Sequence, residues 1–138
     1  MRSDFLPQNE GYQLEIPTLY ESTDYSEDGK VVILQKATEG NGINVAIVGD
    51  GFADVDFTSG HFDNVMHKTM EGLFRLEPMK SFRHLFNVYA VKAVSKHNVF
   101  LDGETALEGK YGNSDSPGYA RAECNPEILR NKYINKIP

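Results

Sequence analysis

The sequence predicts an α/β fold with a partly parallel sheet and one long crossover helix. The first observation is a pair of apolar, β-branched runs with the composition of buried strands, KVVILQKA (30–37) and INVAIVGD (43–50). The second is a change to helical spacing of apolar residues over about 54–76. The third is another strand-like run, FNVYAVKAV (86–94), directly after that segment. A helix between two strands implies that they are parallel and joined by a right-handed connection.

The polar segment 1–29 is expected to be a tail or linker, and residues 30–138 a single α/β domain. A short edge strand is predicted at YQLEIP (12–17), where apolar and polar residues alternate. The acidic stretch YESTDYSEDG (20–29) lacks the alternating ligand pattern of an EF-hand calcium loop. We therefore predict a solvated acidic loop there.

The crossover segment carries one apolar face of an amphipathic helix. The residues of this face recur at intervals of three and four: Phe62, Val65, Met66, Thr69, Met70, Leu73 and Phe74. Asp54, Asp56 and Ser59 are candidate N-caps, and acidic residues near its start suit the helix dipole. Pro78 ends the helix, and SFRHLF (81–86) is expected to add a helical turn.

The C-terminal third is expected to be rich in loops, because residues 95–119 are dominated by Gly, Ser, Asn and Asp. NPEILRNKYINKIP (125–138) predicts a short final helix with Asn125 as its N-cap and Pro126 at its first position. The core is expected to draw on the strands and the apolar helix face: Val32, Ile33, Val45, Ile47, Val65, Met66, Leu73, Phe74, Val88 and Val91.

Composition narrows the possible partners and locations. The 138 residues carry a net charge of −6 without a long basic block, so nucleic acid is not an expected partner. No apolar run approaches the roughly 20 residues of a membrane span, and the N-terminus has no apolar signal-peptide core. The single cysteine, Cys124, cannot form an internal disulfide, and no cysteine-protease signature surrounds it.

The segment VAIVGDGFADVD (45–56) ends a predicted strand with Asp50 between two glycines. A dinucleotide fingerprint would need a third glycine where Asp54 stands, and GETALEGKY (103–111) has one residue too many for a P-loop. Asp50 lies where open α/β sheets place their ligands, so it is the candidate for an acid, base or metal ligand. The alternative is that Asp50 caps the next segment or satisfies the amides of a tight turn.

The histidines do not form a recognisable metal site. His61 and His67 share the predicted helix but point about 240° apart at roughly 100° per residue. Zinc ligands on one helix usually stand four residues apart, as in H-E-x-x-H, and this motif is absent from the sequence. We assign neither a metal ligand nor a cofactor-binding residue in this chain.

Three segments occur in an order that resembles the first part of the catalytic domain of the IgA-peptidase family of zinc metallopeptidases, including members from Bacteroidetes. They are GKVVILQKATEGNGINVAIVGDGF (29–52), LFRLEPMKSFRHLFNVYAVKAVSK (73–96) and GETAL (103–107). The resemblance covers about 29–112 and implies a zincin-like fold whose zinc helix, with H-E-x-x-H, lies further downstream. It also suggests a secreted or cell-envelope protein. Residues 113–138 do not follow the family pattern.

The resemblance and the position of Asp50 together leave three hypotheses. In the first, the chain is a fragment or a truncated, non-catalytic relative of such a peptidase. It is then inactive alone, and zinc and a peptide substrate belong to the full-length protein. In the second, it is an interaction module that binds itself or a complementary peptidase segment through an uncovered sheet edge. In the third, it is a small-molecule or metal-dependent enzyme that uses Asp50.

Overall fold

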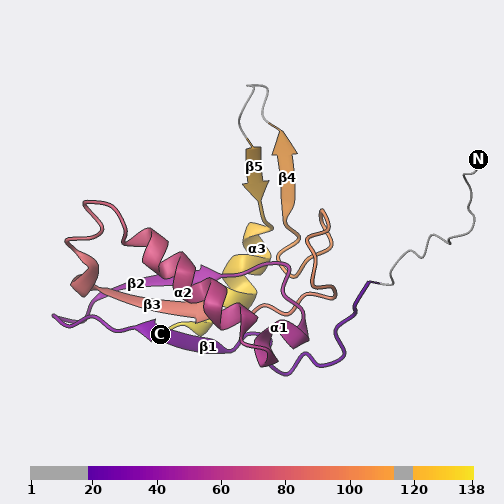
Figure 1. Ribbon diagram of the computed structural model, residues 1–138, viewed down its shortest axis with the longest axis horizontal. Coiled ribbons are helices and arrows are strands. Elements are labelled where there is room, and N and C mark those ends of the chain that lie inside the picture. Colours follow the sequence, from indigo (N-terminus) through magenta and orange to yellow (C-terminus); the bar gives the residue numbers. More distant parts are fainter. Residues whose placement is uncertain (1–18, 114–119) are drawn as a thin grey trace, which may run out of the picture.

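The computed structural model describes residues 19–113 and 120–138, which form a small mixed α/β fold (Figure 1). The expected strand at 12–17 lies outside these residues. Three strands form the main sheet in the order β1-β3-β2, namely β1 (Val31–Gln35), β2 (Ile43–Val48) and β3 (Phe86–Val91). β2 and β3 are parallel, as predicted, whereas β1 is antiparallel to β3.

Only the central strand is buried as the sequence predicts. Five of the six residues of β3 are buried, but β1 and β2 are at most half-buried, which corrects the expectation for both runs. The reason is their place in the sheet, because among residues 19–113 and 120–138 each outer strand has a neighbour on one side only. A continuous apolar run therefore predicts correctly that a segment is a strand, but it does not predict how deeply that strand is buried.

The crossover is two helices instead of the single helix expected over about 54–76. α1 (Asp54–Thr58) and α2 (His61–Leu73) are separated at Gly60, whose φ of 88° is left-handed and ends helical geometry. The N-cap positions are Ala53 and Gly60, so Asp54, Asp56 and Ser59 do not serve as N-caps. Asp56 nevertheless accepts a hydrogen bond from the Ala53 amide at 2.8 Å, which satisfies one free donor of α1.

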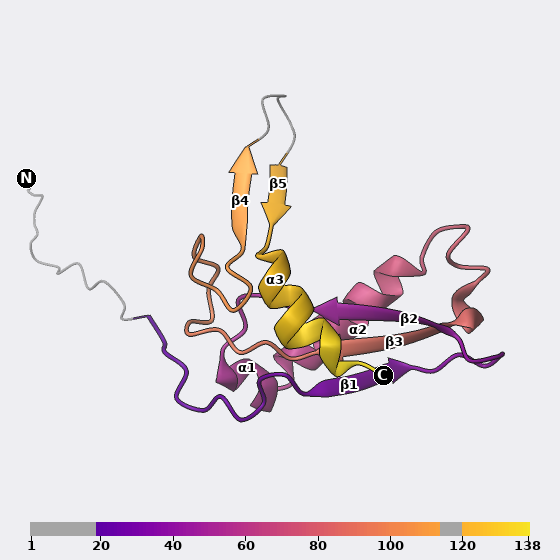
Figure 2. The same cartoon turned by 180° about the vertical axis from the view of Figure 1, so that it is seen from behind.

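Helical segments cover both faces of the sheet (Figures 1 and 2). α2 lies on one face, and the C-terminal segment lies on the other as α3 (Pro126–Ile128), a π-helical turn (Leu129–Tyr133) and a 3₁₀ turn (Ile134–Lys136). Asn125 caps α3 as predicted, because its Oδ1 accepts from the amides of Glu127 and Ile128 at 3.0 and 3.3 Å. The predicted turn before β3 is present at Arg83–Leu85.

The C-terminal third contains one regular feature that the sequence did not predict. β4 (Lys110–Asn113) and β5 (Ala120–Glu123) pair antiparallel and stand away from the main sheet in both views (Figures 1 and 2). The residues between them lie outside the described part of the chain. Within that part, no helix is long and apolar enough to cross a membrane.

The core agrees in part with the expected list. Met66, Phe74, Val88 and Val91 are buried, while Val32, Val45, Ile47 and Val65 are half-buried. Two expectations are wrong, because Ile33 is 58% exposed and Leu73 is 37% exposed. Val32 pairs with Ala90 in the cluster under α2, so Ile33 points to the opposite face of an outer strand. Leu73 is the last residue of α2.

Candidate functional site

The site chosen from the sequence lies where the parallel strands β2 and β3 end. Gly49, Asp50 and Gly51 follow β2 directly, and the φ of Gly51 is 83°, a conformation that glycine adopts without strain. A parallel bridge between Phe52 and Val94 continues the pairing beyond the two strands. Asp50 therefore stands at the carboxyl edge of the sheet, as the sequence predicts.

The Asp50 carboxylate joins this edge to the loop around residue 105. Oδ1 accepts from the amides of Gly51 and Leu107, both at 3.1 Å, and Oδ2 accepts from the Thr105 hydroxyl at 2.6 Å. A Cβ atom at Gly109 would lie 2.5 Å from Oδ2, so glycine is required for this close approach. A carboxylate has about four acceptor positions, and three are used here by the protein itself.

A buried serine supports the same turn from the other side. Ser95 is 2% exposed, and its Oγ accepts from the amides of Gly51 and Ala106 at 3.2 and 2.9 Å. The Ser95 amide donates to the Phe52 carbonyl at 2.7 Å. Sequence reasoning missed Ser95 and Thr105, because hydroxyl residues in a loop without periodicity give no signal of their tertiary partners.

A cavity of 480 Å³ opens beside Asp50. Its wall combines apolar side chains with a few polar groups, namely Ala46, Val48, Phe100, Leu107, Leu129 and Ile134 with Asp50, Lys110, Glu123 and Cys124. Cys124 is a half-buried free thiol in this wall. The cavity is large enough for a small ligand, but the Asp50 oxygens are already engaged by protein donors.

The described residues do not fit the zinc ion that the resemblance implies. Among residues 19–113 and 120–138, no three His, Cys, Asp or Glu side chains are grouped so that they could hold a metal. The histidines have separate surroundings: the His84 Nε2 lies 3.3 Å from Glu39, and the His97 Nδ1 lies 2.8 Å from the Tyr20 carbonyl. His61 and His67 lie six residues apart on α2.

The carboxylates with the most strongly lowered pKa values lie outside this site. Asp54 accepts from the Tyr20 hydroxyl at 2.5 Å and from the amides of Thr23 and Asp24 at 2.8 and 2.9 Å. The hydrogen bond from Tyr20 is the main reason that the pKa of Asp54 falls to about 2. The same contact raises the pKa of Tyr20 to about 12. Asp54 thus attaches residues 20–24 to α1, a role that its position in the sequence does not reveal.

Comparison with known proteins identifies the family. The family model described as IgA Peptidase M64 matches residues 31–111, which is more than half of the chain. No curated protein matches significantly. The matched region begins with β1 and includes the whole main sheet, both crossover helices, and Asp50 with its partners in the loop around Thr105. The chain therefore belongs to the IgA peptidase M64 family.

Proposed function

We propose that this chain forms the non-catalytic, N-terminal part of a zincin-type metallopeptidase scaffold and does not hydrolyse peptides alone. The observation that carries the proposal is the family match over the main sheet and α2, in a sequence without an H-E-x-x-H motif. Metal-assisted peptide hydrolysis, the activity of the parent family, requires ligands that hold the metal and a base that activates water. The described residues offer no such grouping.

Zinc binding and hydrolysis can be tested on the purified 138-residue chain. The chain is incubated with excess zinc, dialysed, and examined by elemental analysis. In parallel, it is incubated with a fluorogenic peptide library with and without a chelator. We expect substoichiometric zinc and no chelator-sensitive hydrolysis. One tightly bound zinc ion per chain, or chelator-sensitive cleavage that survives further purification, would overturn the proposal.

For Asp50 the proposed role is structural, as the anchor of the loop that contains Thr105 and Leu107. Its three accepted hydrogen bonds support this role. Asp50→Ala should then lower the unfolding midpoint, because it leaves the inward-facing amides and hydroxyl without their acceptor. If Asp50→Ala instead abolished binding of a small ligand while leaving stability unchanged, the enzyme hypothesis for this residue would be preferred.

A second candidate function is an interaction module that pairs through the open edges of the sheet. Within the described residues, β1 and β2 each pair on one side only, and each exposes a large apolar side chain, Ile33 at 58% and Ile43 at 55%. Such edges are templates for another strand. If the module hypothesis holds, Ile43→Lys should weaken any association detected by light scattering, because charges on edge strands oppose pairing.

A further inference from the structure

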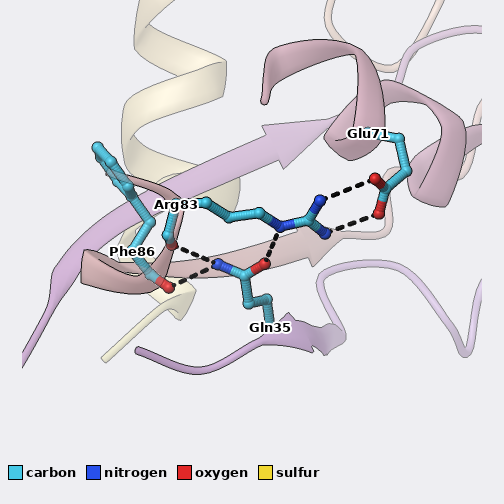
Figure 3. Close-up of polar contacts among 4 residues, drawn as sticks. All are labelled: Gln35, Glu71, Arg83 and Phe86. Carbon is cyan, nitrogen blue, oxygen red and sulfur yellow. Dashed lines mark hydrogen bonds and ion pairs between the residues drawn. The ribbon is translucent and has the colours of Figure 1, made fainter. Parts of the chain in front are cut away.

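The loop that connects α2 to β3 is held in place by a polar cluster at its C-terminal end (Figure 3). The Arg83 guanidinium donates two hydrogen bonds to the Glu71 carboxylate, at 2.8 and 2.7 Å, and a third to the Gln35 Oε1 at 2.8 Å. The Gln35 amide donates in return to the carbonyls of Arg83 and Phe86, at 2.9 and 3.1 Å. These contacts connect α2, β1 and the loop. At the other end of the loop, Phe74 is buried.

This anchored loop presents apolar side chains to solvent. Leu76 is 65% exposed and Phe82 is 50% exposed, and Leu73 at the end of α2 is 37% exposed. A loop that is free to collapse would be expected to bury such side chains, whereas here its two ends are fixed. Large exposed apolar side chains concentrated in one segment are typical of an interaction surface.

The same part of the molecule is positively charged, although the whole chain is acidic. Residues 67–84 contain four Lys or Arg and two Glu, whereas the chain has a net charge of −6. Among the described residues, Lys68, Arg75 and Lys80 form no ion pair. We call this surface the basic end and define it by Leu73, Leu76 and Phe82 with Lys68, Arg75 and Lys80.

A surface of opposite charge lies around α1. Residues 19–29 contain four Asp or Glu and no Lys or Arg. Three of these acids form ion pairs with lysines from other segments, namely Glu21, Glu27 and Asp28. Among the described residues, Asp24 and Asp54 form no ion pair, and the Asp54 hydrogen bonds hold residues 20–24 against the start of α1. This surface also exposes large apolar side chains, at 37 to 48% of their area. We call it the acidic end and define it by Leu19, Tyr20, Tyr25 and Val55 with Glu21, Asp24 and Asp54.

The two ends lie on opposite sides of the molecule (Figure 1). α2 starts next to α1 and runs to the loop of the basic end, and its 13 residues separate the ends by about 20 Å at 1.5 Å per residue. This separation exceeds the Debye length of about 8 Å at physiological salt, so the two charges act almost independently. The basic end of one chain cannot reach its own acidic end.

We propose that the basic end binds the acidic end of a second copy of this chain. Both surfaces combine exposed apolar side chains with net charge, and the charges are opposite, so they are complementary in both respects. Because the two surfaces differ, the contact is head-to-tail. Head-to-tail contacts build open chains of molecules unless their geometry closes a ring. This association differs from pairing of sheet edges, since neither surface includes β1 or β2.

The proposal predicts concentration-dependent association that is sensitive to salt. Sedimentation velocity at about 0.1 M salt should show mass rising with concentration, and the effect should be largely lost at about 1 M salt, where the Debye length is about 3 Å. Leu76→Ser with Phe82→Ser should also weaken association without disturbing the Arg83 cluster. Ile43→Lys on β2 should leave it unchanged, whereas pairing through that edge would show the reverse pattern.

Reciprocal charge reversal gives the decisive test. Arg75→Glu with Lys80→Glu makes the basic end acidic, and Glu21→Lys with Asp24→Lys makes the acidic end basic. Each double variant alone should associate more than about tenfold more weakly than the wild type, because like charges then face each other. An equimolar mixture should associate again, since each reversed end meets a complementary end of the other variant.

The matched control is Arg130→Glu with Lys110→Glu, which changes net charge by the same amount as the first variant at exposed positions outside both ends. This control should associate as the wild type does, and circular dichroism should show that all variants are folded. A wild-type chain that stays monomeric at low salt would overturn the proposal. Failure of the equimolar mixture to associate again would also overturn it. The same holds if the basic end binds anionic lipid vesicles and not a second copy of the chain.

Discussion

Removal of one hydroxyl group from the C-terminal helix measures how firmly that helix is attached to the sheet. Tyr133 is fully buried in the cluster with Val91, Ala93 and Leu107, and its hydroxyl donates to the Asp28 Oδ1 at 2.9 Å. Burial is the main reason that the pKa of Tyr133 is raised, followed by the hydrogen bond to Asp28. The phenol therefore stays protonated at neutral pH and remains a donor.

Tyr133→Phe removes this donor and keeps the ring. A hydrogen bond to a charged group contributes about 1.5–3 kcal/mol. The Asp28 carboxylate keeps two other partners, the Val94 amide at 2.8 Å and the Lys132 ammonium at 3.2 Å, so it is not left without compensation. We therefore expect a loss of about 1–2 kcal/mol in the free energy of unfolding. Tyr133→Ala should cost about 3–5 kcal/mol, because it also leaves a large cavity.

Urea denaturation followed by circular dichroism gives both values. At about 4 °C per kcal/mol, the thermal midpoint should fall by several degrees for Tyr133→Phe and by more than about 10 °C for Tyr133→Ala. Tyr25→Phe is the control, because that ring is 48% exposed and the change should stay within about 0.5 kcal/mol. If both Tyr133 variants also stayed within that range, the C-terminal helix would not be docked in solution and the reasoning would fail.

Three further predictions test other parts of the fold. The contacts of Glu27 with Lys92 and Lys30 lower the pKa of its carboxyl to about 2. The stability that this carboxylate gives the fold is therefore complete above about pH 4.5 and is lost as the pH falls towards 2. Glu27→Gln should flatten the pH dependence of the unfolding midpoint in that range. Gly60→Ala should destabilise by about 1–2 kcal/mol through its left-handed φ alone, since no atom lies within 4 Å of the added Cβ, and an unchanged thermal midpoint would contradict the break between α1 and α2. Met66→Ala should cost about 2–5 kcal/mol by chemical denaturation, because the side chain is 3% exposed in the cluster under α2, and a cost below about 1 kcal/mol would argue against that packing.

The sequence predicts the local elements that have a strong period. The apolar face from Phe62 to Phe74 identified α2, and the strand runs on either side identified the parallel pair β2 and β3. The antiparallel position of β1 could not be predicted in the same way, because no short turn joins β1 to its neighbour β3. Strand order depends on tertiary packing, and a continuous apolar run such as VVILQ lacks the alternation that would have shown Ile33 to be exposed.

The candidate site shows the same division between local and tertiary information. The position of Asp50 at a strand end follows from the pattern of apolar residues and glycines. Its partner Thr105 lies 55 residues further along, in a loop without periodicity, so no local signal connects the two. Asp54 is a similar case, since its partner Tyr20 lies 34 residues earlier. Sequence reasoning therefore locates such carboxylates better than it assigns their roles.

The contact between Asp28 and Tyr133 also constrains when this protein can finish folding. The two residues are 105 positions apart, and the cluster around Tyr133 is one of three that form the core of the described part of the chain. During synthesis, the sheet face opposite α2 stays uncovered until the segment that contains Tyr133 has been made, because that residue completes the cluster on this face. A nascent chain consequently exposes apolar surface until this segment docks, which makes it a candidate for chaperone binding.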